Sequence, residues 1–372
     1  MTGTERGESF GAFFKRYART WHHAVATAAL TALGTLTVLH RLFALLALLA
    51  YVLPPVVLYA RSRSDAGSDS AGDSHSEHHG SGEPAWTTRT VPTDEALTDV
   101  TVDGGRAYAV GAAGTVLCDD GDGWEEVVAD GPEARSTALA GVAATGTGAV
   151  WVAGDAGTVA RIDAETGRHV SYAEPDGDTT NVVALGAAGA ADGETVLLAD
   201  GSGRLRRGRY RDGELAWDEP TTPGSGSSVS GVALSTPSTG FVCDTNQAVF
   251  RTTDGGRTAD RIGLDAPGTP TDLAAAGADG CLVSDDSGAV SRYDGRQWTP
   301  DRVADSAVAA VATRDGQCLA SGPAGTVFER DGDGWTRVAT PATVPLDAVA
   351  LGEDRAVAVG ADGTVVERVA VP

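Results

Sequence analysis

The feature that most restricts the fold of this chain is a repeat that begins near residue 97 and continues to the C-terminus. Each unit holds an apolar strand, a turn, a second strand ending in Gly or Asp, a tight turn, the letters GTV, an Asp-Gly turn and Trp. The period is roughly 38–48 residues, with four short strands per unit, which is the blade size of a β-propeller. The copies lie at 107–127, 150–170, 196–217, 241–259, 281–303, 318–338 and 356–372.

Residue types within a unit predict which strand lies where. The first strand is rich in Ala and Val, as in 307–313 (AVAAVAT), and small residues suit the crowded strand beside a central channel. The GTV letters open the third strand after a turn that depends on Gly. Trp is expected to open the outermost strand, at Trp124, Trp217, Trp298 and Trp335.

The last unit stops before its Trp-led outer strand, and a lone strand stands at the other end of the repeat region. Residues 85–92 (AWTTRTVP) have no strand before them in the sequence. We expect this strand, with Trp86 in the position of Trp124 and with Val91 near its end, to complete the last blade. The prediction is an all-β, seven-bladed propeller over 85–372, closed by an N-terminal strand and without a long free sheet edge.

Two families of propellers resemble these repeats. The pattern S/T-x-D-x-G-x-T-W of the Asp-box (BNR) repeats in sialidase-type propellers is matched once, with a departure at Ala259, where Trp is expected. The matching residues, for which we expect a structural role in the turn, are Thr252, Asp254, Gly256 and Thr258. The residue pattern of 107–127 is more similar to that of the photosystem II stability/assembly factor family. That resemblance implies a scaffold or assembly role without implying photosynthesis, because a fold does not carry activity with it.

Charge divides the chain into two unlike parts. Residues 1–63 hold seven Lys and Arg against two Glu, a net of +5, so the remainder carries −28 to give the total of −23. Lys15 is the only lysine. A strongly acidic, lysine-free domain is typical of halophilic proteins that stay soluble in high salt. The same composition argues against nucleic-acid binding, because no basic surface is available to displace phosphate counterions.

The N-terminal part predicts membrane attachment. Residues 42–60 (LFALLALLAYVLPPVVLYA) form a 19-residue stretch without charge, enough helix to cross a bilayer core. They are the main span of an apolar region at 24–60. Residues 1–23 place aromatic side chains three and four positions apart with basic residues between them, a pattern of an amphipathic interfacial segment. That segment is alternatively an extension of the next helix.

Two topologies follow from this region. With one transmembrane helix, five basic residues precede the span and two follow it, so the propeller lies outside the cytoplasm. If 24–39 also crosses, His40 and Arg41 form a hairpin tip and the propeller is cytoplasmic. We favour one crossing because so short a connection between spans is awkward. The expected partners are the lipid bilayer and an unidentified membrane or cell-surface protein.

Residues 61–84 are rich in Ser, Asp, Gly and His, and we expect a disordered linker because too little apolar surface is present to offset ordering. The run at 75–79, with His75, Glu77, His78 and His79, can bind a transition metal or remain a solvated polar run, which a flexible tether favours. Cys118, Cys243, Cys281 and Cys318 lack metal-like spacing and are expected to be buried. The Asp-Gly turns fit backbone requirements better than calcium. No metal or cofactor is predicted.

The most unusual local feature is RLRRGRYR at 204–211. It holds five arginines in an otherwise acidic domain: Arg204, Arg206, Arg207, Arg209 and Arg211. Alternation along a strand places Arg204, Arg206 and Tyr210 on one face and the other three arginines on the opposite face. Guanidinium groups bind carboxylates and phosphates, so the strand is a candidate docking patch for an acidic partner or an anionic glycan. The alternative is ion pairing with acidic groups of neighbouring blades.

The sequence therefore predicts a membrane-anchored propeller that acts as a protein-binding scaffold or assembly factor and is not an enzyme. The second candidate is a surface glycoside hydrolase or carbohydrate-binding protein of the sialidase-like type. That class needs an arginine cluster, a Tyr–Glu pair and an acidic Asp, and no Arg-Ile-Pro signature accompanies the repeats. A concave axial pocket lined by aromatic residues and convergent Arg and Glu side chains distinguishes the second candidate from the first.

Overall fold

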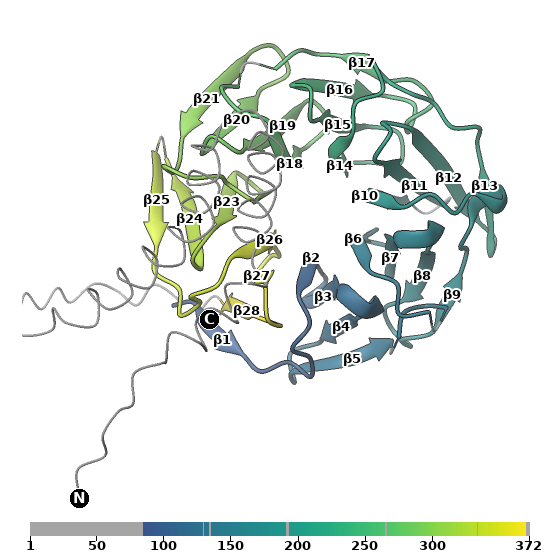
Figure 1. The fold of residues 1–372 in the computed structure, drawn as a ribbon, viewed down its shortest axis with the longest axis horizontal. Helices are drawn as coiled ribbons and strands as arrows, with labels where there is room; N and C mark the ends of the chain where they lie inside the picture. The colour runs from purple at the N-terminus through teal and green to yellow at the C-terminus, as the bar shows by residue number, and fades with distance from the viewer. Residues whose placement is uncertain are drawn as a thin grey trace, which may run out of the picture. The chain divides into compact units, whose positions relative to one another are not determined.

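The computed structural model describes residues 85–128, 130–133, 135–190, 193–264, 266–332 and 334–369. Within these ranges, seven four-stranded antiparallel sheets surround a central axis, so this part of the chain is an all-β, seven-bladed propeller, as the repeat predicts (Figure 1). The interfacial segment, membrane region and linker expected over 1–84, including His75–His79, fall outside the described residues. Among the residues that are described, no helix has the length and apolar character to cross a membrane.

Blades 1 to 6 are meanders, so their strands run from the axis outward in sequence order. Blade 1 holds β2 (Leu97–Asp103), β3 (Arg106–Gly111), β4 (Val116–Asp119) and β5 (Trp124–Val128), and blade 2 holds β6 (Leu139–Ala144), β7 (Ala149–Gly154), β8 (Val159–Asp163) and β9 (His169–Ser171). Blade 3 holds β10 (Val182–Ala190), β11 (Gly193–Asp200), β12 (Leu205–Arg211) and β13 (Glu214–Trp217), and blade 4 holds β14 (Val229–Leu234), β15 (Gly240–Asp244), β16 (Ala248–Thr252) and β17 (Asp260–Arg261).

The remaining blades follow the same plan. Blade 5 holds β18 (Pro270–Ala276), β19 (Gly280–Asp285), β20 (Ala289–Tyr293) and β21 (Trp298–Arg302), and blade 6 holds β22 (Ala310–Arg314), β23 (Gln317–Gly322), β24 (Thr326–Asp331) and β25 (Gly334–Val338). Blade 7 holds β26 (Leu346–Leu351), β27 (Arg355–Gly360), β28 (Val365–Val369) and, from the other end of the described chain, β1 (Thr87–Arg89).

The hydrophobic core consists of layers between neighbouring blades. In one layer Tyr108 and Val110 of blade 1 pack against Leu139 and Val150 of blade 2. In the next, Trp151 of blade 2 belongs to a cluster with apolar residues of β10 and β11. A blade alone cannot cover both faces of its sheet, so each depends on its two neighbours for burial.

The Gly that ends the second strand of several repeats has a steric cause. A Cβ on Gly111, Gly154 or Gly360 would lie 2.1, 2.1 or 2.0 Å from the backbone oxygen of the connector that enters the same blade. In blades 3, 4 and 5 the equivalent residue is a buried Asp whose carboxylate accepts backbone N–H groups of the following turn; these residues are Asp200, Asp244 and Asp285. The glycines thus leave room for the entering connector, whereas the aspartates hold the following turn, and Asp285 also accepts the N–H of Gly268 in the entering connector at 3.1 Å.

This contact yields a stability prediction. The change Gly154→Ala is expected to lower the free energy of unfolding by about 1–3 kcal/mol, because the new methyl group overpacks the connector at Ala138. The matched control is Gly322→Ala in blade 6, where the Cβ would lie 3.1 Å from the oxygen of Ala307 and a smaller loss is expected. Urea unfolding of both variants measures the difference, and an equal loss would contradict the steric explanation.

The position of Trp in the outer strands differs from the prediction in one blade. Trp124 and Trp298 begin β5 and β21, and Trp335 is the second residue of β25. Trp217 instead ends β13, so the expectation that it opens the strand is wrong. The strand β13 starts at Glu214, three residues before Trp217, directly after the turn at 212–213.

The strand β1 lies beside β28, with Thr87 opposite Glu367 and Arg89 opposite Val365. Trp86 precedes this strand, is 5% exposed, and packs in the cluster between blades 6 and 7. Its Nε1 donates to Glu329 Oε1 at 3.2 Å. Val91 packs against the cluster between blades 7 and 1. The segment around β1 therefore contacts the layers on both sides of blade 7.

The contact between blade 7 and blade 1, called the seam below, contains a buried ion-pair network. The Arg355 side chain, 8% exposed, places Nη2 2.5 Å from Glu367 Oε1 and 3.0 Å from Asp119 Oδ2. Arg89 Nε lies 2.6 Å from Glu367 Oε2. The network thus links β1, β28 and β27 to β4 of blade 1, and its charges compensate one another inside the protein.

Candidate protein-binding surface

The arginine-rich segment forms β12, the third strand of blade 3, together with Arg204 just before it. Because side chains alternate along a strand, its arginines reach two different surroundings. Arg204 and Arg206 turn to the connector between blades 2 and 3, whereas Arg207 and Arg209 turn to Asp218, which follows β13.

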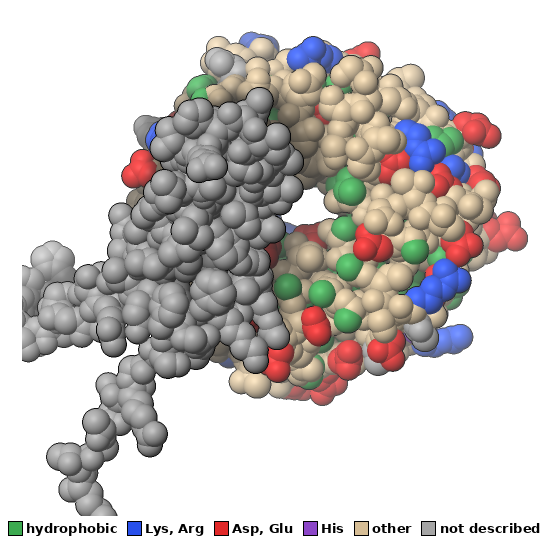
Figure 2. Space-filling model, in the orientation of Figure 1, with side chains coloured by type: hydrophobic (Ala, Val, Ile, Leu, Met, Phe, Trp, Pro, Cys, Tyr) green, Lys and Arg blue, Asp and Glu red, His purple; other side chains and the backbone are tan. Residues whose placement is uncertain are grey.

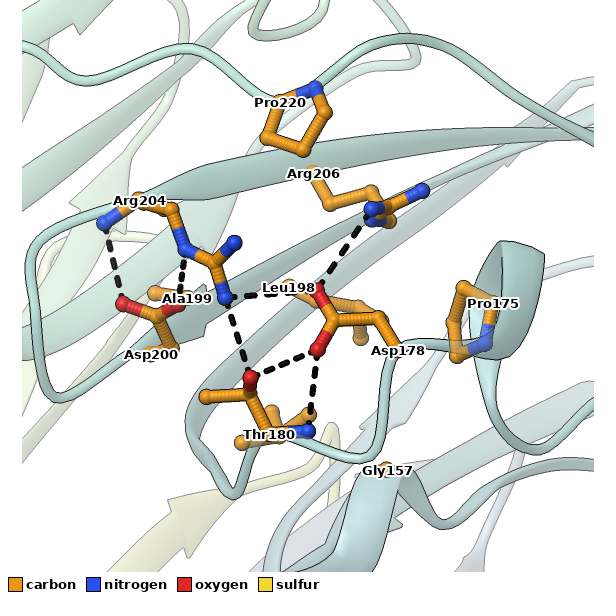
Figure 3. A pocket seen from close by; sticks show the side chains of 11 residues that line it. Gly157, Pro175, Asp178, Thr180, Leu198, Ala199, Asp200, Arg204, Arg206 and Pro220 are labelled. Carbon is orange, nitrogen blue, oxygen red and sulfur yellow. Dashed lines mark hydrogen bonds and ion pairs between the residues drawn. The ribbon is translucent and has the colours of Figure 1, made fainter.

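Carboxylates outnumber guanidinium groups around Arg204 and Arg206. Arg204 Nε lies 2.6 Å from Asp200 Oδ2, and its Nη2 lies 3.2 Å from Asp178 Oδ2. Arg206 Nη1 lies 2.7 Å from Asp176 Oδ2. Figure 3 shows Arg204, Arg206, Asp178 and Asp200 converging around a small pocket of about 30 Å³. These two arginines hold the connector against blade 3 and leave no positive excess.

Hydrogen bonds within the connector strengthen this cluster. The hydroxyl and the backbone N–H of Thr180 both donate to Asp178 Oδ1, at 2.6 and 3.0 Å. These bonds lower the pKa of Asp178, and the charges of Arg204 and Arg206 add to the effect. The carboxylate therefore stays ionised and paired with the arginines at neutral pH.

Around Asp218, by contrast, guanidinium groups outnumber carboxylates. Arg207 Nη1 lies 2.8 Å from Asp218 Oδ2, Arg209 Nη2 lies 3.2 Å from Oδ1, and Arg257 Nε of blade 4 lies 3.6 Å from Oδ2. Burial disfavours the ionised form of Asp218, but the hydrogen bond from Arg207 and the charges of its arginine neighbours lower its pKa overall. Three guanidinium groups thus share one carboxylate. We call Arg207, Arg209 and Arg257 with Asp218 the arginine cluster.

The members of the arginine cluster differ in exposure. Arg207 is 8% exposed, and its Nε is buried without a hydrogen-bond partner among the described residues. The side chains of Arg209 and Arg257 are 49% and 55% exposed. Figure 2 shows basic side chains next to acidic ones on the outer part of the ring. The exposed pair can reach an anionic group in solution.

A groove adjoins the arginine cluster. It has a volume of about 540 Å³ and runs between β11 and β12 of blade 3 and the turn at Pro237 and Ser238 of blade 4. Its lining includes Arg207, Arg209 and Arg211 together with three carboxylates, Glu194, Asp212 and Glu214. An extended segment that enters this groove passes directly beside the guanidinium groups.

Thr252, Asp254, Gly256 and Thr258, which resemble an Asp-box in sequence, form a compact turn at the end of β16. Thr258 donates its backbone N–H and its hydroxyl to Asp254, at 2.9 and 2.8 Å, and Thr252 Oγ1 accepts the N–H of Gly256 at 2.8 Å. These bonds lower the pKa of Asp254 against the opposing effect of burial. Because the carboxylate oxygens serve the turn's own donors, this residue has a structural role, and the turn positions Arg257.

A second buried charge was not identifiable from the sequence. Glu194 of β11 is 6% exposed and accepts a hydrogen bond from Trp151 Nε1 at 2.7 Å. Arg161 Nη2 lies 2.8 Å from its Oε1, and the guanidinium lies 4.5 Å from the ring centre of Tyr210. The network joins blades 2 and 3. Tyr210 and Glu194 thus lie on the second and third strands of blade 3, and protein donors occupy the carboxylate.

The axial cavity of the propeller has a volume of about 400 Å³ and is lined by the innermost strands. Its lining consists of Ala, Gly, Val, Leu, Ser and Thr with three carboxylates, Asp99, Asp272 and Asp347. Among the described residues that line it, there is no aromatic side chain, Arg or Glu. The axis therefore lacks the groups that a sialidase-like site requires.

The cysteines fit the expectation of burial in three of four positions. Cys243, Cys281 and Cys318 are buried, whereas Cys118 is half-buried. Over the described ranges no group of three His, Cys, Asp or Glu side chains is arranged to hold a metal ion.

No protein-family model and no curated protein matches this chain. Solved propeller structures do. YCF48 from Cyanidioschyzon merolae is 16% identical with a TM-score of 0.59, over 77% of this chain and 98% of that one. YCF48 bound to a D1 peptide is 13% identical with a TM-score of 0.62, over 77% and 97%. The WD40 propeller domain of Doa1 is 13% identical with a TM-score of 0.60, over 77% and 96%. At these identities the likeness shows the propeller fold alone.

Proposed function

We propose that this chain is a protein-binding propeller that presents the arginine cluster to an acidic segment of a partner protein. The observation that carries the proposal is the charge balance: three positive charges face one negative charge, a local excess of +2. This excess stands in a part of the chain, residues 64–372, whose net charge is −28, the total of −23 less the +5 of residues 1–63. Guanidinium groups with free donors bind carboxylates in forked geometry.

The structure favours binding over hydrolysis. A sialidase-like enzyme needs convergent Arg, Glu and Tyr side chains at an accessible pocket, and the axial lining contains none of these types. Glu194 and Tyr210, on the second and third strands of blade 3, are held by Trp151 and Arg161 of blade 2. One of the similar structures, YCF48, is bound to a peptide, which supports peptide recognition as a use of this fold.

The finer proposal is a scaffold or assembly factor for membrane or cell-surface proteins. It rests on the apolar stretch at 42–60 and on the basic residues that precede it, which place the propeller outside the cytoplasm if the chain crosses once. A tether of this kind raises the local concentration of the propeller near membrane partners. Protease added to intact cells tests the topology: cleavage within 61–84 supports the outward propeller, and full protection supports the two-span alternative.

The test of the binding proposal uses charge reversal. The double variant Arg209→Glu with Arg257→Glu is expected to reduce capture of the partner by tenfold or more, because each charge-assisted hydrogen bond contributes about 1.5–3 kcal/mol. The measurement is cross-linking in intact membranes at high salt, followed by affinity capture and mass spectrometry. Both side chains are about half exposed, so the fold is expected to survive.

The matched control is Arg135→Glu with Arg302→Glu, which reverses two charges of similar exposure elsewhere on the propeller. Full capture by the control and loss in the cluster variant support the proposed surface. Equal loss in both would place the partner elsewhere. Capture of the chain by itself, without a stoichiometric partner, would contradict the scaffold proposal and direct attention to glycan binding.

A further inference from the structure

The arginine cluster holds more positive charge than its own carboxylate balances. Arg207, Arg209 and Arg257 bring three positive charges to the one negative charge of Asp218, which leaves an excess of +2. Glu219 is the next residue and is exposed, and within the described part of the chain it forms no ion pair with these arginines. A group with a single negative charge would balance half of the excess, whereas a group with two would balance all of it.

Asp218 fixes the guanidinium groups in place before a ligand arrives. Its side chain is 25% exposed and holds Arg207 through Oδ2 and Arg209 through Oδ1. Its backbone N–H donates to the carbonyl oxygen of Arg207 at 2.8 Å, which ties the carboxylate to β12. Side chains that are already held in this way lose little conformational freedom when they bind a ligand.

The exposed arginines keep most of their donors for a ligand. A guanidinium group has five N–H donors. Arg209 donates to Asp218 through Nη2, whereas Arg257 Nε lies 3.6 Å from Asp218 Oδ2, beyond hydrogen-bond distance. Because both arginines lie against the same carboxylate, one ligand group can contact both of them.

A phosphate group fits these donors better than a carboxylate does. A carboxylate offers two oxygen atoms and one negative charge. A phosphorylated side chain offers three strong acceptor oxygens and carries about −1.5 to −2 charges at neutral pH. The charge of the phosphate therefore matches the excess of +2, and its third oxygen accepts a further donor from Arg209 or Arg257.

The groove beside the arginine cluster argues against a long acidic run as the occupant. Asp212 follows Arg209 by three residues, about 10 Å along the chain. Asp212 and Glu214 line the groove and are exposed, with Arg211 between Arg209 and Asp212 in the chain. Several carboxylates laid along the groove would meet these two like charges. A single side chain with two charges places both of them at the cluster.

We propose that the partner segment bound by the arginine cluster carries a phosphorylated serine or threonine. The phosphate contacts Arg209 and Arg257, while Arg207 and Asp218 hold these groups from behind. This inference rests on the proposed function, because it names the chemical group that the same surface recognises. Arginine clusters are a recurrent means of binding phosphorylated segments.

Peptide binding to the full-length protein tests the chemical group. The probes are labelled peptides of sequence Gly-Ala-X-Gly-Ala-Gly with phosphoserine, Glu or Ser at X. Fluorescence anisotropy at pH 8 in 1 M NaCl measures their affinities, since screening over about 3 Å leaves direct contacts only. The phosphoserine peptide is expected to bind about tenfold or more tightly than the Glu peptide, the gain from one further charge-assisted hydrogen bond.

Charge reversal locates this preference on the protein. The double variant Arg209→Glu with Arg257→Glu is expected to lose the preference for phosphoserine. The control Arg135→Glu with Arg302→Glu should keep it, because these exposed arginines lie outside the cluster. Equal affinities for the phosphoserine and Glu peptides, or no binding of the phosphoserine peptide, would overturn the inference. Preferential binding to phosphatidic acid vesicles would also overturn it, because the occupant would be a lipid.

Phosphatase treatment separates this inference from the proposed function. Membranes are treated with active or heat-inactivated phosphatase before cross-linking, and mass spectrometry confirms that phosphate has been removed from the captured proteins. Active phosphatase is expected to reduce partner capture about tenfold or more. Capture that survives removal of phosphate but is lost in the cluster variant would refute the phosphate and leave the proposed surface intact.

Discussion

Replacing Arg355 by Leu is expected to lower the free energy of unfolding by about 3–5 kcal/mol. The substitution removes the positive centre of the seam network and leaves the side chains of Asp119 and Glu367, 6% and 3% exposed, inside the protein. Arg89 still pairs with Glu367, but Asp119 has no other ion-pair partner among the described residues. Urea unfolding monitored by tryptophan fluorescence gives the value.

The control for this change is Arg302→Leu, which removes an exposed arginine beside Asp305. Exposed pairs contribute about 0–1 kcal/mol, so this variant is expected to resemble the wild type. A small effect at Arg355 would show that the buried carboxylates become protonated or hydrated at little cost. In that case the Arg355→Leu variant should show a stronger pH dependence of stability than the wild type.

The second large effect is expected at the strand that meets β28. Trp86→Ala should cost about 3–5 kcal/mol, because the indole is 5% exposed within the cluster between blades 6 and 7. The change also removes the hydrogen bond from Trp86 Nε1 to Glu329. We propose that this segment holds the ring closed in solution, and the variant measures how far ring stability depends on it.

A complementation experiment separates ring closure from the loss of one side chain. A chain that begins at Thr93 lacks β1, and its exposed β28 is expected to promote self-association. Adding a peptide of residues 84–92 should restore a monomeric ring, whereas the same peptide with Trp86 replaced by Ala should not. Thr87→Ala in the full chain is the mild control, because this side chain is exposed. An unchanged, monomeric truncated protein would exclude a closing role.

The architecture could be predicted from the sequence because the same pattern of strands and turns recurs in each blade. Alternation of apolar residues sets the strands, and Gly and Asp at the end of the second strand mark a connector that must pass closely over it. The single misplaced residue, Trp217, ends β13 instead of opening it, although two residues separate β12 from β13 and also β24 from β25. The repeat pattern therefore predicts the strand without fixing where its Trp lies along it.

The site was predictable only in part. Five arginines in one strand were visible in the sequence, but which of them are neutralised depends on Asp178, Asp200 and Asp218, whose positions follow from folding. Arg257 belongs to another repeat and had no signal of its own. Glu194 also escaped prediction, because a glutamate is buried only when partners such as Arg161 arrive from a neighbouring blade. The sequence does contain a sign of the axial carboxylates, because Asp follows Thr at the same blade position in 97–100 (LTDV) and 270–273 (PTDL).

The short strand β1 also has a mechanical consequence. Any tension applied through the N-terminal arm enters the ring at Ala85 and reaches this three-residue strand before any other. The strand is fastened by Trp86 and Arg89 at its two ends, through Glu329 and Glu367. Peeling it away would leave blade 7 with three strands and expose the edge of β28. If β1 holds the ring closed, as proposed above, the tension that the ring withstands is set by the contacts of Trp86 and Arg89.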